Sequence, residues 1–128
     1  MKLNQECIRD ILLYIEENLT YESWIEASSL PLDKYSSEEL IYTVEKLIEA
    51  DFLNCSTSHY IGSSLPAIRI KSITYSGHQF LDNIRDDKVW KETKNIVSKV
   101  SSASIQIISD VASKVITNII SKQMGLPT

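Results

Sequence analysis

Two cysteines and two histidines are the side chains of this 128-residue sequence that could act as soft metal ligands: Cys7, Cys55, His59 and His78. Cys55 and His59 stand at a spacing that suits one half of a zinc site, but no second Cys/His pair follows at the spacing that the other half needs. We therefore expect no structural metal. We expect His78 to pack or to form a hydrogen bond at the start of a helix, rather than to act as a base.

Catalytic patterns are missing from the sequence. It contains no glycine-rich phosphate loop, no Gly-x-Ser-x-Gly turn and no His-Glu-x-x-His pair. Asp86 and Asp87 are adjacent, so their side chains diverge on a helix and make a poor catalytic pair. Because no set of nucleophile, base and oxyanion donors can be assembled, we expect a protein that binds without catalysis and needs no cofactor.

Charge is distributed unevenly along the chain, whose formal net charge is −4. Residues 1–53 carry four basic and twelve acidic side chains, whereas residues 54–128 carry nine basic and five acidic ones. These two parts suit different partners, or they are two ordinary solvated faces. The candidate protein-binding surface is a set of seven glutamates: Glu16, Glu17, Glu22, Glu26, Glu38, Glu45 and Glu49.

DNA is the alternative partner. The side chains available to contact phosphates or bases are Lys34, Tyr35, Tyr42, Lys46, Arg69 and Lys71. However, residues 37–49, where a recognition helix would lie, carry four glutamates and one lysine, and duplex phosphates would repel them. Nucleic acid is therefore the less favoured partner. Arg69 and Lys71 can also be interpreted as charged residues that keep a strand edge from pairing.

Hydrophobic spacing predicts the elements that position these residues. Apolar residues at three- and four-residue steps predict a helix over residues 4–19, with Asn4 as its N-cap. Weak alternation predicts a short strand over residues 21–27, followed by a loop or a single helical turn. Ser36 and Glu39 have the form of a capping box at the start of a second helix, which ends near residue 49.

A hairpin is expected over residues 53–73, because Gly62 marks a turn and alternation follows it. Ile68 and Ile70 should face the core, while Arg69 and Lys71 should face the other way. Further helices follow, one capped by Thr74 and one that restarts at Asp86 or Asp87 and continues through Val97. The fold class is therefore mainly α with a small antiparallel sheet, and residues 1–90 are predicted to form a winged helix-turn-helix-like domain.

Residues 91–128 are predicted to be a C-terminal helical oligomerisation segment, mostly one long amphipathic helix from about Lys91 to Met124. Gly125 and Pro127 predict its end. The apolar stripe along this helix is too wide for one small domain to cover, so we expect the chain to form a dimer or a tetramer. The alternatives are folding back on the same chain and lying on a membrane surface. The predicted oligomerisation residues are Val100, Ile105, Ile108, Val111, Ala112, Val115, Ile116 and Ile119.

Composition bounds the protein class. Three glycines and three prolines are few for an all-β or disordered chain, and two cysteines cannot form a disulfide framework. No signal peptide follows Met1, and no apolar run approaches the ~20 residues of a membrane span. We expect a soluble protein of a reducing compartment, which is the cytoplasm, with no membrane span.

The segment 73–90 reads Ile-Thr-Tyr-Ser-Gly-His-Gln-Phe-Leu-Asp-Asn-Ile-Arg-Asp-Asp-Lys-Val-Trp. It resembles the signature of an uncharacterised family of small proteins encoded by phages, prophages and other bacterial mobile elements. Residues 1–19 and 40–52 are similar to that family as well, and the chain is distantly similar to the YjcQ-like phage winged-helix proteins. The resemblance implies a mobile-element origin and a winged-helix core, but it supplies no catalytic or binding residues.

The same segment also has an architectural interpretation. Thr74 can cap the helix that follows the second hairpin strand, and Gly77 allows that helix to approach the sheet closely. Taken together, the sequence predicts a self-associating binding protein that acts on a host or phage protein as an accessory regulator or inhibitor. A DNA-binding regulator is the second hypothesis.

Overall fold

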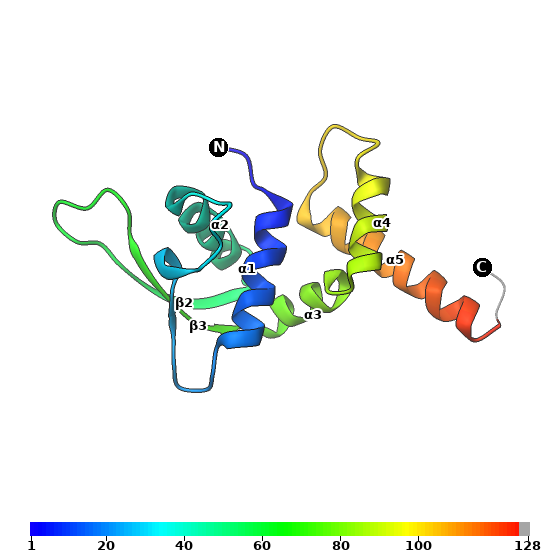
Figure 1. Cartoon of the computed structure of the whole chain (residues 1–128), viewed down its shortest axis with the longest axis horizontal. Coiled ribbons are helices and arrows are strands. Elements are labelled where there is room, and N and C mark those ends of the chain that lie inside the picture. Colours follow the sequence, from blue (N-terminus) through cyan, green and yellow to red (C-terminus); the bar gives the residue numbers. More distant parts are fainter. Residues whose placement is uncertain (126–128) are drawn as a thin grey trace. The chain divides into compact units, whose positions relative to one another are not determined.

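The computed structural model describes residues 1–125, and contacts group the chain into two compact units (Figure 1). Unit 1 is Met1–Gln79, and unit 2 begins at Phe80, within a helix and before the predicted boundary at residue 90. The described elements are, in order, α1 (Gln5–Asn18), β1 (Ile25–Glu26), the 3-10 turn η1 (Ala27–Ser29), α2 (Ser37–Glu49), β2 (Leu53–Ser58), β3 (Ala67–Ile73), α3 (Tyr75–Ile84), α4 (Asp87–Val97) and α5 (Ile105–Gln123). The predicted mainly helical class with a small antiparallel sheet is confirmed.

Helix α1 begins where its capping residue predicts. The side chain of Asn4 accepts hydrogen bonds from the backbone N–H groups of Glu6 and Cys7, at 3.0 and 3.3 Å. These bonds satisfy two amides that have no partner within the helix. The apolar stripe of α1 is buried in the core of unit 1, where Ile8, Ile11 and Ile15 are at most 1% exposed.

Helix α2 has a cap at each end. The Ser36 hydroxyl accepts from the Glu39 N–H at 3.1 Å, as the capping-box pattern predicts. At the other end Asp51 adopts a left-handed conformation (φ 62°), and the N–H of Phe52 donates to the carbonyl of Leu47 at 2.8 Å. This pairing is a Schellman-type termination, and it turns the chain directly into β2.

The sheet has the strand order β1-β3-β2, with both pairings antiparallel. Helices α1 and α2 contact β3 and β2, and Ile68 and Ile70 of β3 are buried. Arg69 and Lys71 are exposed, so the predicted alternation of this strand is confirmed. This arrangement leaves the face of the sheet that carries the two cations open.

A bulge interrupts the β2–β3 ladder. Cys55 pairs with Ile70, whereas the preceding residue, Asn54, pairs with Ser72. Lys71 is therefore an extra residue on β3 with no partner of its own in this register. A bulge changes the direction of the side chains that follow it, and Lys71 and Ser72 both line the open face of the sheet.

Two contacts set the start of α3. The Thr74 hydroxyl accepts from the N–H of Gly77 at 3.0 Å and donates to the carbonyl of Asp51. Gly77 is buried so close to the residue before β2 that an added Cβ would stand 2.3 Å from the carbonyl oxygen of Phe52. Both the predicted Thr74 cap and the close approach at Gly77 are confirmed.

Unit 2 has its own small core, in which α4 packs against α5 (Figure 1). The carboxylate of Asp86 accepts from the N–H of Val89 at 2.9 Å and caps α4. Asn83 donates to the hydroxyl of Ser109 at 2.9 Å. The buried side chains of α4 and α5 are Val89, Trp90, Thr93, Ile108, Ala112 and Val115.

A long C-terminal helix is confirmed, but it does not begin near Lys91. Helix α4 ends at Val97 and α5 begins at Ile105. Serines explain the break, because their hydroxyls compete for backbone hydrogen bonds. The hydroxyl of Ser98 donates to the Asn95 carbonyl at 2.7 Å, and that of Ser104 accepts from the Ile107 N–H at 3.2 Å. Gly125 follows α5 with a φ of 72°, and the predicted stop at Pro127 lies outside the described residues.

Candidate functional site

The candidate metal ligands Cys7, Cys55, His59 and His78 lie in different surroundings. Cys7 is buried in α1, and burial raises the pKa of its thiol. Burial also raises the pKa of the Cys55 thiol to about 11, so both thiols are protonated at neutral pH. His59 is exposed beyond the end of β2. Within residues 1–125, no group of three or more His, Cys, Asp or Glu side chains is arranged to hold a metal ion.

Four of the six candidate DNA-binding residues already have partners within unit 1. The Tyr35 hydroxyl donates to Asp10 at 2.6 Å, and the Lys34 ammonium lies 3.1 Å from the same carboxylate oxygen. Burial and the hydrogen bond to Asp10 raise the pKa of Tyr35. These side chains tie the loop before α2 to α1.

Tyr42 and Lys46 make the second set of internal contacts. The Lys46 ammonium lies 2.7 Å from a carboxylate oxygen of Glu49 and 5.3 Å from the centre of the Tyr42 ring. The Tyr42 hydroxyl donates to the Met1 carbonyl at 3.4 Å. The positive charge of Lys46, the one lysine of α2, is therefore neutralised by a carboxylate on the same helix.

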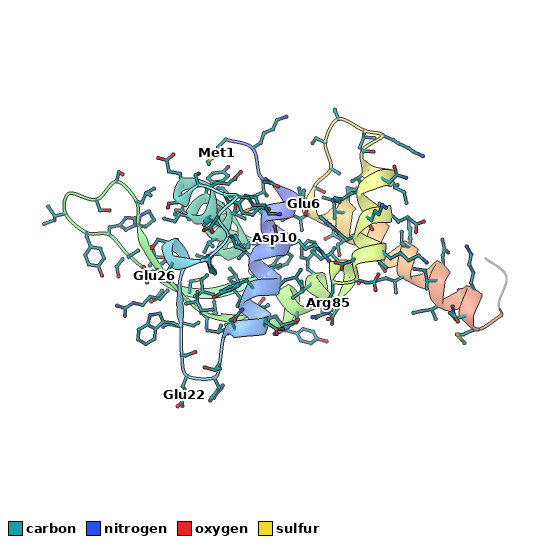
Figure 2. All side chains as sticks on the ribbon, viewed as in Figure 1. Met1, Glu6, Asp10, Glu22, Glu26 and Arg85 are labelled. Atoms are coloured by element: carbon teal, nitrogen blue, oxygen red, sulfur yellow. The ribbon has the colours of Figure 1, made fainter. Side chains whose placement is uncertain are left out.

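The seven candidate glutamates do not form one group. Glu38, Glu45 and Glu49 are exposed, and their spacing places them on one stripe of α2. We call this stripe the acidic α2 face. Glu17 is exposed near the end of α1, and Glu26 is half-buried in β1. Glu16 and Glu22 instead line a cleft on the open side of the sheet, and Figure 2 shows Glu22 at the far end of the turn that follows α1.

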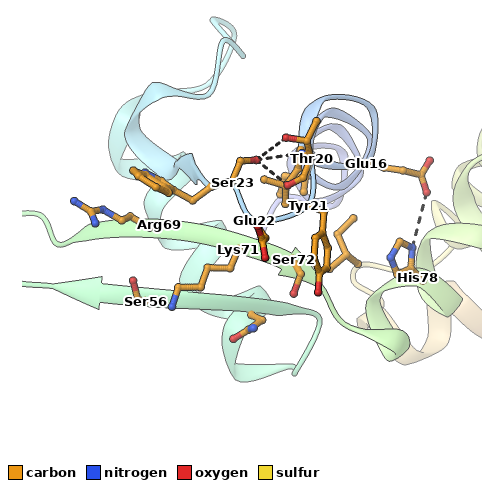
Figure 3. Close-up of a pocket in the computed structure, with 15 residues that line it drawn as sticks. Glu16, Thr20, Tyr21, Glu22, Ser23, Ser56, Arg69, Lys71, Ser72 and His78 are labelled. Carbon is orange, nitrogen blue, oxygen red and sulfur yellow. Dashed lines mark hydrogen bonds and ion pairs between the residues drawn. The ribbon is translucent and has the colours of Figure 1, made fainter.

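This cleft, the sheet cleft, has a volume of about 750 Å³ and lies wholly within unit 1 (Figure 3). Its floor comes from Asn54 and Ser56 of β2 and from Arg69, Lys71 and Ser72 of β3. The turn between α1 and β1 forms one wall. The C-terminal end of α1 and the first turn of α3 close the cleft. The volume suits a small molecule.

The turn that walls the sheet cleft is fixed by its own hydrogen bonds. The Ser23 hydroxyl donates to the Thr20 carbonyl at 2.7 Å and lies 2.9 Å from the Thr20 hydroxyl. Glu22 holds a left-handed conformation (φ 63°), which is costly for a residue other than glycine. A turn restrained in this way offers a defined wall rather than a loose loop.

Two sequence-predicted cations, Arg69 and Lys71, lie together in the sheet cleft (Figure 3). The Arg69 guanidinium stacks over the ring of Trp24, 5.0 Å from its centre. At the other end of the view, Nδ1 of His78 lies 4.0 Å from a carboxylate oxygen of Glu16. The His78 side chain is 51% exposed at the edge of the cleft. Its contact is with the carboxylate of Glu16, and not with a hydroxyl or thiol that it could activate.

Sequence reasoning did not find the sheet cleft. It found the alternation that exposes Arg69 and Lys71, but not the bulge at Lys71 or the turn that brings Trp24 onto Arg69. The one signal in the sequence was a tryptophan, Trp24, close to an expected turn. Its contact with Arg69 could not be predicted, because the two residues are far apart in the sequence and meet only in the folded chain.

The predicted oligomerisation residues divide into two groups. Ile108, Ala112 and Val115 are at most 6% exposed within unit 2, so they are not available to a second copy. Their burial against α4 also shows that one copy covers the centre of the stripe. The other predicted residues remain at least partly exposed: Val100, Ile105, Val111, Ile116 and Ile119. Among residues 1–125, no helix is both long and apolar enough to cross a membrane.

Comparison with known proteins finds one family model and one curated relative, which is described as uncharacterized. An uncharacterized protein of Haemophilus influenzae (strain ATCC 51907 / DSM 11121 / KW20 / Rd) is 30% identical over 123 residues, covering 94% of this chain and 99% of that protein. No solved structure matches the chain. Residues 2–104 match the family described as "Hypothetical protein (DUF2513)", a match that ends just before α5. The chain therefore belongs to the DUF2513 family of hypothetical proteins.

Proposed function

We propose that this chain is a non-enzymatic binding protein of a phage or other mobile element, acting in the cytoplasm of a bacterial host. Its target is a host or phage protein, on which it acts as an accessory regulator or inhibitor. It binds this target through the acidic α2 face. The apolar residues of α5 that α4 leaves exposed associate with a second copy of the chain. Mobile-element origin is supported by the resemblance of residues 73–90 to a phage-associated family.

The charge of α2 carries this proposal. The order helix, strand, helix, strand, strand, helix supports a winged-helix interpretation of unit 1, in which α2 takes the position of the recognition helix. In this chain that helix exposes the acidic α2 face, and its one lysine is balanced by Glu49. Such a face repels phosphates and complements a basic protein surface. We therefore propose a partner with a basic docking surface.

Self-association is the second part of the proposal. After α4 covers the centre of the α5 stripe, Ile107 and Ile120 remain 50% and 51% exposed on its two sides. Val100 is 59% exposed in the segment before α5. Apolar residues at these positions support a contact with a second copy, because that contact would remove them from water.

The test is a partner measurement with matched charge reversals. The full-length chain is used to recover partners from cells of its own source, and each recovered protein is then purified and titrated by calorimetry. We expect Glu38→Lys/Glu45→Lys to weaken binding at least tenfold, because both changes lie on the acidic α2 face and leave the Lys46–Glu49 pair intact.

The matched control is Glu92→Lys/Asp110→Lys, which changes net charge by the same amount on exposed positions of unit 2. We expect it to leave binding unchanged and the affinity of the native chain to fall with added salt. If the two double variants weaken binding equally, or if neither does, the acidic α2 face is not the docking surface.

A DNA-binding regulator is the second candidate. It is favoured by Arg69 and Lys71, which are exposed on the hairpin and form no ion pair with any carboxylate among residues 1–125. Against it, Lys34 and Lys46 are paired with Asp10 and Glu49. Two remaining cations provide few of the phosphate contacts that a duplex complex uses.

A further inference from the structure

The sheet cleft has one cationic end. Arg69 and Lys71 alternate along β3 and therefore project from the same face of the sheet, and the bulge adds Ser72 to the same lining. Ser56 pairs with Arg69 in the register, so its hydroxyl lies on that face too. Two cations beside serine hydroxyls are the groups that bind a phosphate oxygen.

The stack of Arg69 on Trp24 prepares this end for an anion. A guanidinium on an aromatic face keeps its charge and keeps the N–H donors in its own plane, where they can form paired hydrogen bonds to phosphate. The ring centre lies 5.0 Å from the guanidinium carbon, so the ring favours this position of Arg69 before a ligand arrives. No ion pair with a described carboxylate competes for it.

Aromatic side chains flank the same cleft. Trp24 is 56% exposed although Arg69 lies over its ring, and Tyr21 is 95% exposed. Both line the cleft, and Figure 3 shows Tyr21 in the turn that follows α1. Exposed rings at the wall of a cleft offer flat surfaces on which a planar ligand ring can stack. A bare anion would leave them unused.

The end of the cleft away from Arg69 has the opposite character. Glu16 lies beside His78 there, separated by 4.0 Å. The carboxylate accepts hydrogen bonds, so it suits N–H groups on the edge of a ligand ring. The sheet cleft therefore combines anion donors, stacking surfaces and a terminal acceptor within about 750 Å³.

We propose that the sheet cleft binds a small phosphate ester of a planar base, of the class of nucleoside monophosphates. The phosphate contacts Arg69 and Lys71, the base stacks beside Trp24 and Tyr21, and the base edge faces Glu16. A small ligand fits better than a long nucleic acid, because residues 1–53 carry a net charge of −8 from four basic and twelve acidic side chains. This site is separate from the acidic α2 face.

The test is a calorimetric titration of the full-length chain with AMP, GMP and CMP, accompanied by tryptophan fluorescence. Trp24 is 56% exposed and Trp90 is 4% exposed, so a ligand in the sheet cleft should change the emission of Trp24. We expect at least one nucleotide to bind below 1 mM. Inorganic phosphate and the matching nucleoside should each bind at least tenfold more weakly.

Variants locate the site. We expect Arg69→Gln/Lys71→Gln to weaken nucleotide binding at least tenfold, and Trp24→Leu to weaken it several-fold and abolish the fluorescence change. The matched control Lys88→Gln/Lys91→Gln, at exposed positions of α4, should bind normally. Circular dichroism and melting temperature establish that every variant is folded.

Three results would overturn the proposal. The first is no nucleotide binding up to 1 mM, and the second is equal binding by the Arg69→Gln/Lys71→Gln variant and the native chain. The third comes from a single-stranded oligonucleotide used as a competitor. If it binds more tightly than every mononucleotide and with a steep salt dependence, the cleft belongs to a nucleic-acid surface instead.

Discussion

Gly77 stands directly against the carbonyl oxygen of Phe52, and a Cβ built at residue 77 would lie 2.3 Å from that oxygen and 2.7 Å from the Ile73 side chain. The Thr74 cap one turn earlier also reaches back, because its hydroxyl donates to the Asp51 carbonyl. The start of α3 is therefore fixed against the backbone that joins α2 to β2. This contact gives the glycine in the signature segment a structural role.

Gly77→Ala should destabilise the protein by about 3 kcal/mol, because backbone atoms cannot move aside for the new methyl group. Urea denaturation of the native and variant chains measures the difference. The control is Ser76→Ala, an exposed position in the same helical turn, for which we expect a change below about 0.5 kcal/mol. Equal stability of Gly77→Ala and the native chain would contradict this packing.

Thr93→Val should leave stability unchanged or raise it by about 1 kcal/mol. Thr93 is fully buried in unit 2, and its hydroxyl has no hydrogen-bond partner among the described residues. Valine has nearly the same shape and a similar helix propensity, so the change removes only the cost of burying a polar group. Thermal melting measures the effect, with the exposed Thr117→Val on α5 as the control. A loss of more than about 1 kcal/mol in Thr93→Val alone would show that the hydroxyl is satisfied.

Cys55 should make stability fall at alkaline pH. Burial raises the pKa of its thiol from 9.0 to about 11 in the folded chain, so the folded state holds a proton that the unfolded state releases. The contribution of this thiol is complete below pH 9 and is lost as the pH rises to about 11. Urea denaturation of the native chain and Cys55→Ala across this range measures it. We expect the stability gap to narrow with rising pH, and a constant gap would contradict the assignment.

Charged residues on the exposed flanks of α5 should dissociate the proposed assembly. Ile107→Glu/Ile120→Glu changes two side chains that are about half exposed within one copy, so unit 2 should remain folded. Light scattering should give a dimer or tetramer for the native chain and a monomer for this variant. The control, Gln106→Glu/Asn118→Glu, adds the same charge at exposed polar positions of α5 and should keep the native mass. A monomeric native chain would contradict self-association.

Local signals in the sequence predicted much of the fold. Asn4, Ser36, Thr74 and Asp86 all act as the caps that their residue types favour, because an N-cap depends on only three or four consecutive residues. The alternation of buried and exposed side chains along β3 also depends on only a few consecutive residues. In contrast, the C-terminal segment was predicted as one helix, because its apolar period continues through serines whose hydroxyls end α4 and start α5.

The candidate site was less predictable, since it depends on contacts between distant residues. Lys34 and Lys46 look available in the sequence, but Asp10 and Glu49 pair with them in the fold. Whether a charge is paired depends on packing that residue spacing does not specify. In the same way, neither the bulge at Lys71 nor the stack of Trp24 on Arg69 follows from composition or periodicity. The sheet cleft could therefore be identified only from the folded structure.

The most direct test of the acidic α2 face is a fluorescence-anisotropy titration of a labelled 20-base-pair duplex with the full-length chain, from low to physiological salt. We expect no binding below about 10 µM for the native chain, and a gain of affinity for Glu38→Lys/Glu45→Lys, because the reversal removes the repulsion of phosphates. Sub-micromolar binding by the native chain, with affinity falling steeply as salt rises, would show that α2 is instead part of a DNA-binding surface.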